Sequence, residues 1–275
     1  LSKLISRMNL FMSDYKVRFF DPGRWFEDHE DEMMVEISRV LRAGDLILRK
    51  DVEIFEENLA KHVGTKYAIG LNSGTDSLYL ALRYLCIGLH GKDDEVLVPA
   101  YTFVATAQVV RQVGSTPVLY DMAGDLPITE KTTVIIPAHI EGVFDRRFDE
   151  LLKLSIERNL PIIEDACQAL GAVKNPISFA QAWSFYPAKI LGAYGDAGAL
   201  TTNDEKLYKW VKEARNHFKN TNGDWGINSR MDNLQAAILN VKFKYLEETL
   251  LARESIALYY NEGLQVAQYS NFIDI

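Results

Sequence analysis

The sequence of 275 residues has only two cysteines, Cys86 and Cys167. Their number and spacing exclude a disulfide framework and a cysteine-based metal site, so a reducing cytoplasm is the expected compartment. No apolar run approaches the roughly 20 residues needed to cross a bilayer, and no membrane association is expected. The chain also lacks a block of basic residues, because 30 Lys and Arg face 38 Asp and Glu, for a net charge of −8. This balance argues against nucleic acid as a partner.

Hydrophobic residues are present in quantity, at 48% of the chain, beside 25% charged residues, which is enough for a substantial core. From Tyr67 onward, short apolar runs alternate with helical patterns. This alternation predicts an α/β fold with a mostly parallel, seven-stranded sheet and helices on both faces. Strands are expected at 67–71, 95–98, 116–120, 132–136, 161–165, 182–186 and 198–202. Helices are expected at 28–42, 52–63, 75–87, 103–113, 147–159 and 204–219, with one or two more within 230–262.

One stretch, Ser184 to Gly198, is poorly explained as a solvated surface. It continues an apolar run, breaks at Pro187, presents a single lysine, Lys189, and then contains three glycines that let another molecule approach the backbone. A lysine just beyond a buried strand can be partly desolvated, and desolvation allows an amine to lose its proton and attack a carbonyl group. The alternative interpretation is a surface lysine in a glycine-rich loop.

Two other strand ends carry groups suited to a cofactor. Asp165 follows the apolar residues Pro161 to Ile163, at the end of a strand where open α/β sheets place their ligand crevice. A carboxylate there can hold a proton on a ring nitrogen, as pyridoxal phosphate (PLP) requires, or it can simply cap a helix. Gly74 and Thr75 follow another strand and begin a helical pattern whose free N–H groups can bind phosphate. The simpler interpretation of that second feature is an ordinary capped helix.

Together and in this order, these features resemble the DegT/DnrJ/EryC1/StrS family of PLP-dependent sugar aminotransferases, over about residues 17–264. Five motifs in register carry the resemblance, and as a set they are far more specific than any one of them. They are Ser73-Gly74-Thr75, Val98 to Thr106, Glu164 to Ala169, Ser184 to Gly198 and Gly226 to Asp232. The resemblance implies the fold type I architecture of PLP-dependent transferases.

The resemblance also implies roles for individual residues. Lys189 would condense with the aldehyde of PLP and later move a proton, and Asp165 would keep the ring nitrogen protonated. Gly74, Thr75 and Ser184 would hold the phosphate, Phe103 would stack on the ring, and Gln168 would face the phenolic oxygen. Asn228 would reach the phosphate of the neighbouring subunit, which makes a homodimer with shared active sites the expected assembly. Further candidates for substrate contact are His139, Tyr186 and Arg230. Two alternatives stay open: a lone histidine such as His139 is more often structural, and Phe103 could be a core residue at a helix start.

The implied reaction is a ping-pong transfer of an amino group from an amino acid, with glutamate expected, to a keto group of a nucleotide-linked deoxysugar. Such reactions serve the biosynthesis of amino sugars and cell-surface polysaccharides. Family members in which histidine replaces the lysine are sugar dehydratases, and Lys189 argues against that branch.

Three segments are expected: an N-terminal extension without fixed structure at 1–14, a large PLP-binding α/β domain at 15–230, and the start of a small C-terminal domain at 231–275. Family members usually continue through a longer C-terminal domain that helps to cover the site. The shorter chain leaves a second hypothesis open. In it, the protein is a catalytically inactive PLP-binding homologue that acts as a dimeric binding or regulatory module.

Overall fold

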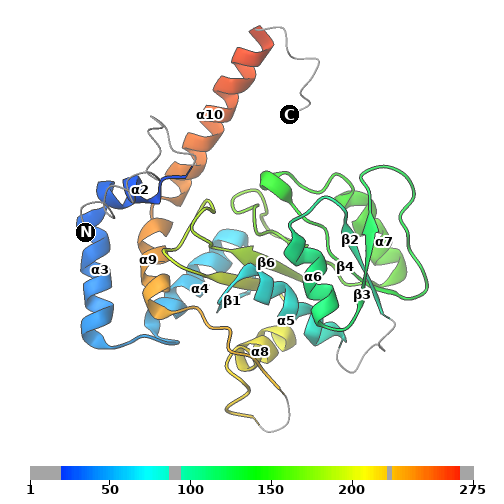
Figure 1. Ribbon diagram of the computed structural model, residues 1–275, viewed down its shortest axis with the longest axis horizontal. Coiled ribbons are helices and arrows are strands. Elements are labelled where there is room, and N and C mark those ends of the chain that lie inside the picture. Colours follow the sequence, from blue (N-terminus) through cyan, green and yellow to red (C-terminus); the bar gives the residue numbers. More distant parts are fainter. Residues whose placement is uncertain (1–19, 87–93, 222–224, 267–275) are drawn as a thin grey trace, which may run out of the picture.

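The computed structural model describes residues 20–86, 94–221 and 225–266 (Figure 1). The predicted extension at 1–14 lies outside the described residues. Within the described ranges, none of the helices combines the length and hydropathy that crossing a bilayer would require.

Seven strands form the centre of the molecule, as the alternation of apolar runs predicted. They are β1 (Tyr67–Leu71), β2 (Glu95–Pro99), β3 (Thr116–Tyr120), β4 (Thr132–Ile135), β5 (Ile163–Asp165), β6 (Ala180–Ser184) and β7 (Gly198–Thr202). Their order is β3-β2-β4 in one group and β5-β6-β7-β1 in the other. Isolated parallel bridges from Ile135 to Ile162 and from Ala138 to Asp165 join the groups between β4 and β5. The ladders are parallel except at β7, which runs antiparallel to both β6 and β1.

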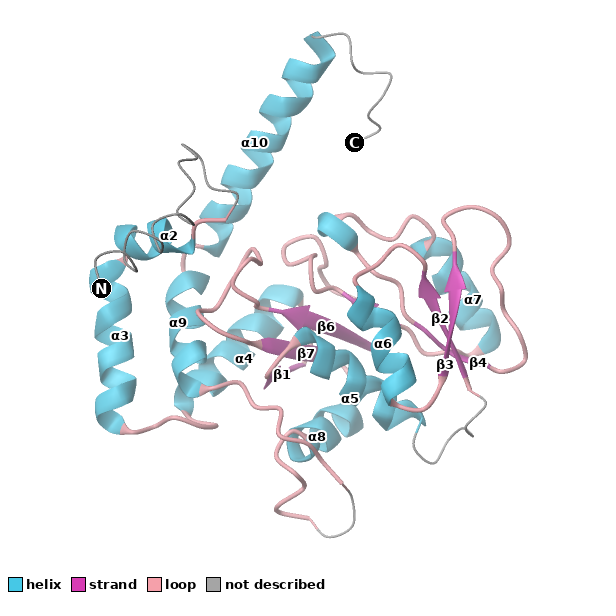
Figure 2. Ribbon diagram, in the orientation of Figure 1, coloured by secondary structure: helices cyan, strands magenta, loops and turns pink. Residues whose placement is uncertain are grey.

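Helices cover both faces of this sheet (Figure 2). The alternation of side chains sends Ile69, Ala182 and Leu200 to one face, where they pack with α5 (Gly74–Cys86), α6 (Val104–Gln112) and α8 (Glu205–Ala214). Their neighbours Trp183 and Ala199 face the other side and pack with α4 (Lys50–Val63) and α9 (Asn233–Phe243). Beside them, α7 (Phe148–Arg158) packs against β2 and β4. The predicted α/β class with two covered faces is therefore confirmed.

The strand predicted at 182–186 is wrong by two residues at each end. The strand β6 ends at Ser184, yet Phe185 is buried in the core, where its ring meets that of Phe55 edge-on at 5.0 Å. The apolar run continues past the strand because a loop residue also packs into the core. As a result, Lys189 lies five residues beyond the strand rather than three.

Beside α9, three further helices lie at one end of the body: α2 (Pro22–Asp28), α3 (Glu30–Ala43) and α10 (Leu246–Val266). The segment predicted as one or two helices within 230–262 is two. Figure 1 shows α10 projecting away from the sheet, whereas α9 lies against α3 and α4. The domain boundary expected after residue 230 stays a prediction, and α9, which follows it, packs with the large body.

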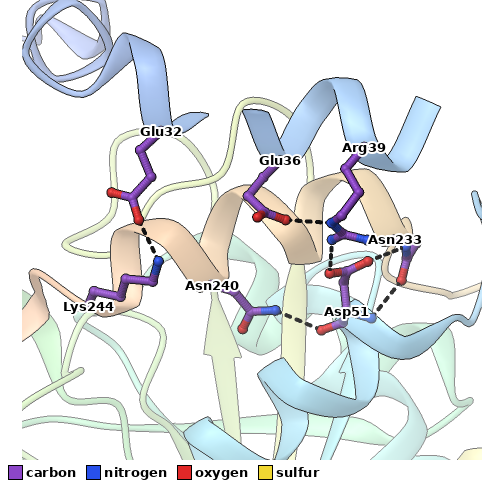
Figure 3. A network of polar contacts seen from close by, with 7 residues as sticks. All are labelled: Glu32, Glu36, Arg39, Asp51, Asn233, Asn240 and Lys244. Atoms are coloured by element: carbon purple, nitrogen blue, oxygen red, sulfur yellow. Dashed lines mark hydrogen bonds and ion pairs between the residues drawn. The ribbon is translucent and has the colours of Figure 1, made fainter. Parts of the chain in front are cut away.

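A polar network fixes α9 to the start of α4 (Figure 3). The side-chain oxygen of Asn233 accepts hydrogen bonds from the backbone N–H groups of Asp51 (3.1 Å) and Val52 (3.3 Å), so a residue of α9 caps α4. The Asn233 amide group donates to the Asp51 carboxylate at 2.7 Å, and Arg39 of α3 binds the same carboxylate. The amide group of Asn240 donates to the Asp51 carbonyl at 2.9 Å. The helix α9 is therefore held against the start of α4 at two positions seven residues apart.

Candidate active site

One cavity of about 510 Å³ lies beyond the ends of β5 and β6, at the start of α5. Nine of the eleven side chains singled out in the sequence line it: Gly74, Thr75, Phe103, His139, Asp165, Gln168, Ser184, Tyr186 and Lys189. The other two, Asn228 and Arg230, are not among its lining residues. Asn228 is exposed, and the Arg230 guanidinium donates to the Asn216 side chain at 2.9 Å. Side chains from segments more than 100 residues apart thus meet around one space.

The turn between β1 and α5 forms one end of the cavity. The Ser73 hydroxyl accepts the N–H of Asp76 at 3.1 Å and caps α5, so the amides of Gly74 and Thr75 lie in the first helical turn, where the helix itself offers N–H groups no partner. Ser184 faces this turn from β6 and accepts the Tyr186 N–H at 3.3 Å. Backbone N–H groups, a hydroxyl and a helix start together suit a phosphate group.

The packing around this turn requires glycine at two positions, Gly74 in the turn itself and Gly198 at the start of β7. A Cβ atom at Gly74 would overlap the Cys167 sulfur, and one at Gly198 would overlap the backbone of Ser73 and Gly74. The overlap at Gly74 is with a side chain, which a substitution of Cys167 can shorten. The overlap at Gly198 is with backbone atoms, which no substitution removes.

We therefore expect Gly74→Ala and Gly198→Ala both to weaken PLP binding, with Gly198→Ala also losing more stability, by about 1–3 kcal/mol or more. Adding Cys167→Ala should recover part of the Gly74→Ala loss and none of the Gly198→Ala loss. Thermal unfolding and PLP titration of the singles and doubles, each compared with Cys167→Ala alone, measure this coupling. Equal recovery in both backgrounds would contradict the assigned overlaps.

The Asp165 carboxylate occupies the wall at the end of β5 and is 7% exposed. The Thr106 hydroxyl donates to one of its oxygens at 2.7 Å, and the Cys167 N–H donates to the other at 3.2 Å. In the described part of the chain no cationic side chain forms a salt bridge with it. A positive group that approaches from the cavity would further stabilise a nearly buried carboxylate whose donors are neutral. A protonated ring nitrogen is such a group.

Gln168 and Phe103 shape the middle of the cavity. The Gln168 carbonyl oxygen accepts the N–H of Glu141 at 2.9 Å, which leaves the amide N–H₂ group as the part that can donate to a ligand oxygen. Glu141 reaches this position with a left-handed backbone, at a φ of 58°. The Phe103 side chain, at the start of α6, is 64% exposed and lines the cavity, so it is not the core residue that the simpler interpretation supposed.

Lys189 belongs to the segment 185–197, the lysine loop, which connects β6 to β7. The Lys189 N–H donates to the Tyr186 carbonyl at 2.8 Å, so the lysine ends a tight turn that begins at Tyr186. Its side chain is half-buried and lines both the main cavity and an adjoining one of about 400 Å³. The Lys189 side chain therefore faces two adjoining cavities.

Cys167 is half-buried and lines the same cavity as Lys189 and Asp165, and the charges of both affect its thiol. Burial raises the pKa of this thiol well above its usual value, and the Asp165 carboxylate adds to the rise while Lys189 opposes it. Cys167 therefore stays a neutral thiol, and it fills space beside Gly74 rather than supplying a nucleophile.

The His139 ring is fully buried, and both of its nitrogens are engaged. The N–H of Asp145 donates to Nδ1 at 3.1 Å, so the proton is on Nε2, which donates to the Glu164 carboxylate at 2.8 Å. The Ser178 hydroxyl donates to the same carboxylate. Because both nitrogens have partners within the protein, the structural interpretation of this residue fits better than a polar contact with substrate.

Sequence reasoning missed Thr106 and the role of Glu164. Thr106 lies within a motif that the sequence singled out, but its bond to Asp165 spans 59 positions and leaves no local signal. Glu164 was visible as one of two adjacent carboxylates, and strand alternation places the two on opposite faces of the sheet, so only Asp165 reaches the cavity.

Residues 27–274 match the family model of the DegT/DnrJ/EryC1/StrS aminotransferase family. The chain belongs to this family. It is 36% identical to the UDP-2-acetamido-2-deoxy-3-oxo-D-glucuronate aminotransferase of Pseudomonas aeruginosa, covering 90% of this chain and 73% of the relative. It is also 36% identical to the dTDP-3-amino-3,4,6-trideoxy-alpha-D-glucose transaminase of Streptomyces venezuelae, covering 90% and 69%. The solved structure of DesV from S. venezuelae superposes with a TM-score of 0.84 at 35% identity, over 90% of this chain and 71% of that one.

Membership in this family makes the protein a PLP-dependent aminotransferase, as the five motifs indicated. The residues present fit PLP, whose phosphate, aldehyde and basic ring nitrogen each need a different partner. The first turn of α5 with Ser184, the Lys189 amine and the Asp165 carboxylate supply one partner for each, around one cavity.

Proposed function

We propose that this enzyme transfers an amino group from an amino acid, with glutamate as the expected donor, to a keto group of a nucleotide-linked deoxysugar. The proposal places the reaction in the biosynthesis of amino sugars or cell-surface polysaccharides. The relatives in Pseudomonas aeruginosa and Streptomyces venezuelae carry names of enzymes for UDP-linked and dTDP-linked sugars. The observation that carries the proposal is the convergence of Lys189, Asp165 and the α5 start on one cavity.

In this proposal each side chain binds or orients one part of PLP. The amides of Gly74 and Thr75 and the Ser184 hydroxyl hold the phosphate. Asp165 holds a proton on the ring nitrogen, Phe103 covers a ring face, and the Gln168 amide donates to the phenolic oxygen. When bound, PLP supplies an electron sink for the carbanion formed at the amino-acid Cα.

Lys189 performs the proton transfer. With PLP bound, the Lys189 amine would be the group that attaches the cofactor through its aldehyde. The same amine would move the proton, as a general base at the donor Cα and a general acid at the C4′ carbon. The turn at 186–189, closed by the bond from the Lys189 N–H to the Tyr186 carbonyl, would hold the lysine backbone while the side chain moves the proton. The same steps in reverse deliver nitrogen to the keto sugar.

Asn228 is proposed to act in the site of a second copy of the chain. It is exposed and lies outside the cavity of its own chain, while its buried neighbour Ser229 links this segment to α5, since the Ser229 hydroxyl donates to Asp76 at 2.6 Å. A homodimer of this kind has two sites, and each takes its phosphate contacts from both chains.

Mixed dimers test this assignment. A dimer of one Lys189→Ala chain and one Asn228→Ala chain should contain one site with both defects and one intact site. We therefore expect co-expression, with a different affinity tag on each chain, to yield mixed dimers with about half of the wild-type turnover per dimer. Each parent homodimer should be far less active. Mixed dimers no more active than the Asn228→Ala parent would contradict the shared site.

The reaction itself is tested with purified protein saturated with PLP. Glutamate should bleach the absorption of the lysine-bound cofactor, and addition of nucleotide-linked 3-keto or 4-keto sugars should restore it with formation of an amino sugar. Absorption that glutamate leaves unchanged would instead support the inactive PLP-binding module. A screen of both keto positions with UDP and dTDP carriers then identifies the substrate.

A further inference from the structure

Two residues of α9, Gln235 and Lys242, form hydrogen bonds with the lysine loop. They lie seven positions apart and therefore on the same side of the helix. The Gln235 side-chain oxygen accepts the N–H of Tyr194 at 3.0 Å. The Lys242 ammonium donates to the Gly192 carbonyl at 2.6 Å. Neither residue of this α9 pair lines either cavity that Lys189 faces.

Two aromatic rings enclose the Lys242 ammonium. The nitrogen lies 4.2 Å from the centre of the Tyr194 ring and 4.9 Å from that of Trp25. Both distances are within the range of cation–π attraction. The Tyr194 hydroxyl also donates to the Pro22 carbonyl at 3.2 Å, which ties the lysine loop to the start of α2. Lys242 is therefore the point at which α9, α2 and the lysine loop meet.

Within the loop, the position of Gly192 is coupled to the turn that presents Lys189. Gly192 packs directly on the Pro187 carbonyl, so closely that a Cβ atom would overlap it. The next N–H, that of Ala193, donates to the Phe185 carbonyl at 2.8 Å. A force that fixes the Gly192 carbonyl therefore also restrains Phe185 and Pro187, the residues on either side of Tyr186, where the turn at 186–189 begins. The ammonium of Lys242 supplies that force through one strong, charge-assisted bond.

We propose that Lys242 and Gln235 are positioning residues that fix the lysine loop and so aim the Lys189 amine at the cofactor. This role rests on the proposed function of Lys189, but the rigidity of the loop does not require bound PLP. The protein can therefore be tested with and without the cofactor, and the two ideas can fail separately.

The first test replaces Lys242 with Met, which keeps most of the length of the side chain and removes its charge. Hydrogen exchange of the amides in 186–196 should become at least about tenfold faster in the PLP-free protein, with little change in the strands. Lys242→Arg, which retains a cationic donor between the rings, should restore slow exchange. With PLP and glutamate, kcat should fall about tenfold or more in Lys242→Met, while the KM for glutamate changes less.

Lys244→Met is the matched control, because Lys244 ends the same helix and binds Glu32 of α3 rather than the lysine loop (Figure 3). It should leave both exchange and kcat within about twofold of wild type. If Lys242→Met fails to fold, Gln235→Leu provides the second test, since it removes only the bond to Tyr194. Exchange in 186–196 that is unchanged in Lys242→Met, or changed equally in Lys244→Met, would overturn the positioning role. Wild-type protein with slow exchange but no PLP binding would instead reject the proposed function alone.

Discussion

Lys189→Ala is expected to abolish covalent attachment of PLP and to reduce amino transfer to background, while the protein remains folded. The turn at 186–189 is closed by backbone atoms, so it does not depend on the lysine side chain. Loss of the general base alone typically costs about 10²–10⁴-fold in rate, and loss of the covalent step adds to that. Absorption spectra, steady-state turnover with glutamate and thermal unfolding measure the three effects.

Lys153→Ala is a suitable control for this experiment. The Lys153 side chain is 78% exposed on α7, with only a distant ion pair to Glu157, and it should behave as wild type. A Lys189→Ala protein that still forms the lysine-bound absorption band would show that another lysine holds the cofactor. A variant that unfolds would mean that the side chain contributes to stability in a way that its contacts do not indicate.

Asp165→Ala is expected to have the second largest effect, with weaker PLP binding and almost no catalysis. A carboxylate beside a ring nitrogen raises the pKa of that nitrogen by about 1–3 units, which changes its protonated fraction by up to a thousandfold. Without the charge, the ring becomes a poor electron sink. The measurements are PLP affinity, kcat with glutamate, and the pH dependence of the absorption of the bound cofactor.

Asp165→Asn separates charge from shape in the same experiment. The asparagine can still accept the Cys167 N–H, so it should retain more PLP affinity than alanine, and its kcat should stay as low. Thr106→Val removes only the hydroxyl that orients the carboxylate, and an intermediate loss is expected. Near-full turnover of Asp165→Ala would show that this carboxylate does not serve the ring nitrogen.

Local sequence patterns predicted most of the strands and helices, and also the functional side chains that follow the strand ends. Buried strands are short apolar runs between helical periods, and parallel strands bring their carboxyl ends to one edge. For that reason Asp165 and Lys189 could be expected in one crevice before any contact was known. The strand ends were less certain, as Phe185 shows, because a loop residue that packs into the core looks like a strand residue in the sequence.

The sequence did not indicate which residues form hydrogen bonds with Asp165 and with the lysine loop. The bond from Thr106 to Asp165 and the bond from Lys242 to the lysine loop join segments 50 or more positions apart. Nor did a pattern reveal that β7 runs antiparallel, since an apolar run has no direction. Such features arise when elements pack, so they are visible only in three dimensions.

The two lysines also show why geometry decides the site. Burial lowers the pKa of Lys242 to about 8, a property often associated with a reactive amine. Yet Lys242 lies behind the lysine loop and lines neither cavity, whereas Lys189 lines both. Its lowered pKa reflects enclosure among aromatic rings and helices.

The most direct measurement is therefore to trap the cofactor on its lysine. The wild-type protein is saturated with PLP, reduced with borohydride, digested, and mapped by mass spectrometry. The pyridoxyl phosphate group should be found on Lys189 at close to one per chain and should be absent from the Lys189→Ala protein. Stoichiometric labelling of Lys242 or any other lysine, with Lys189 unmodified, would contradict the assignment of the active site.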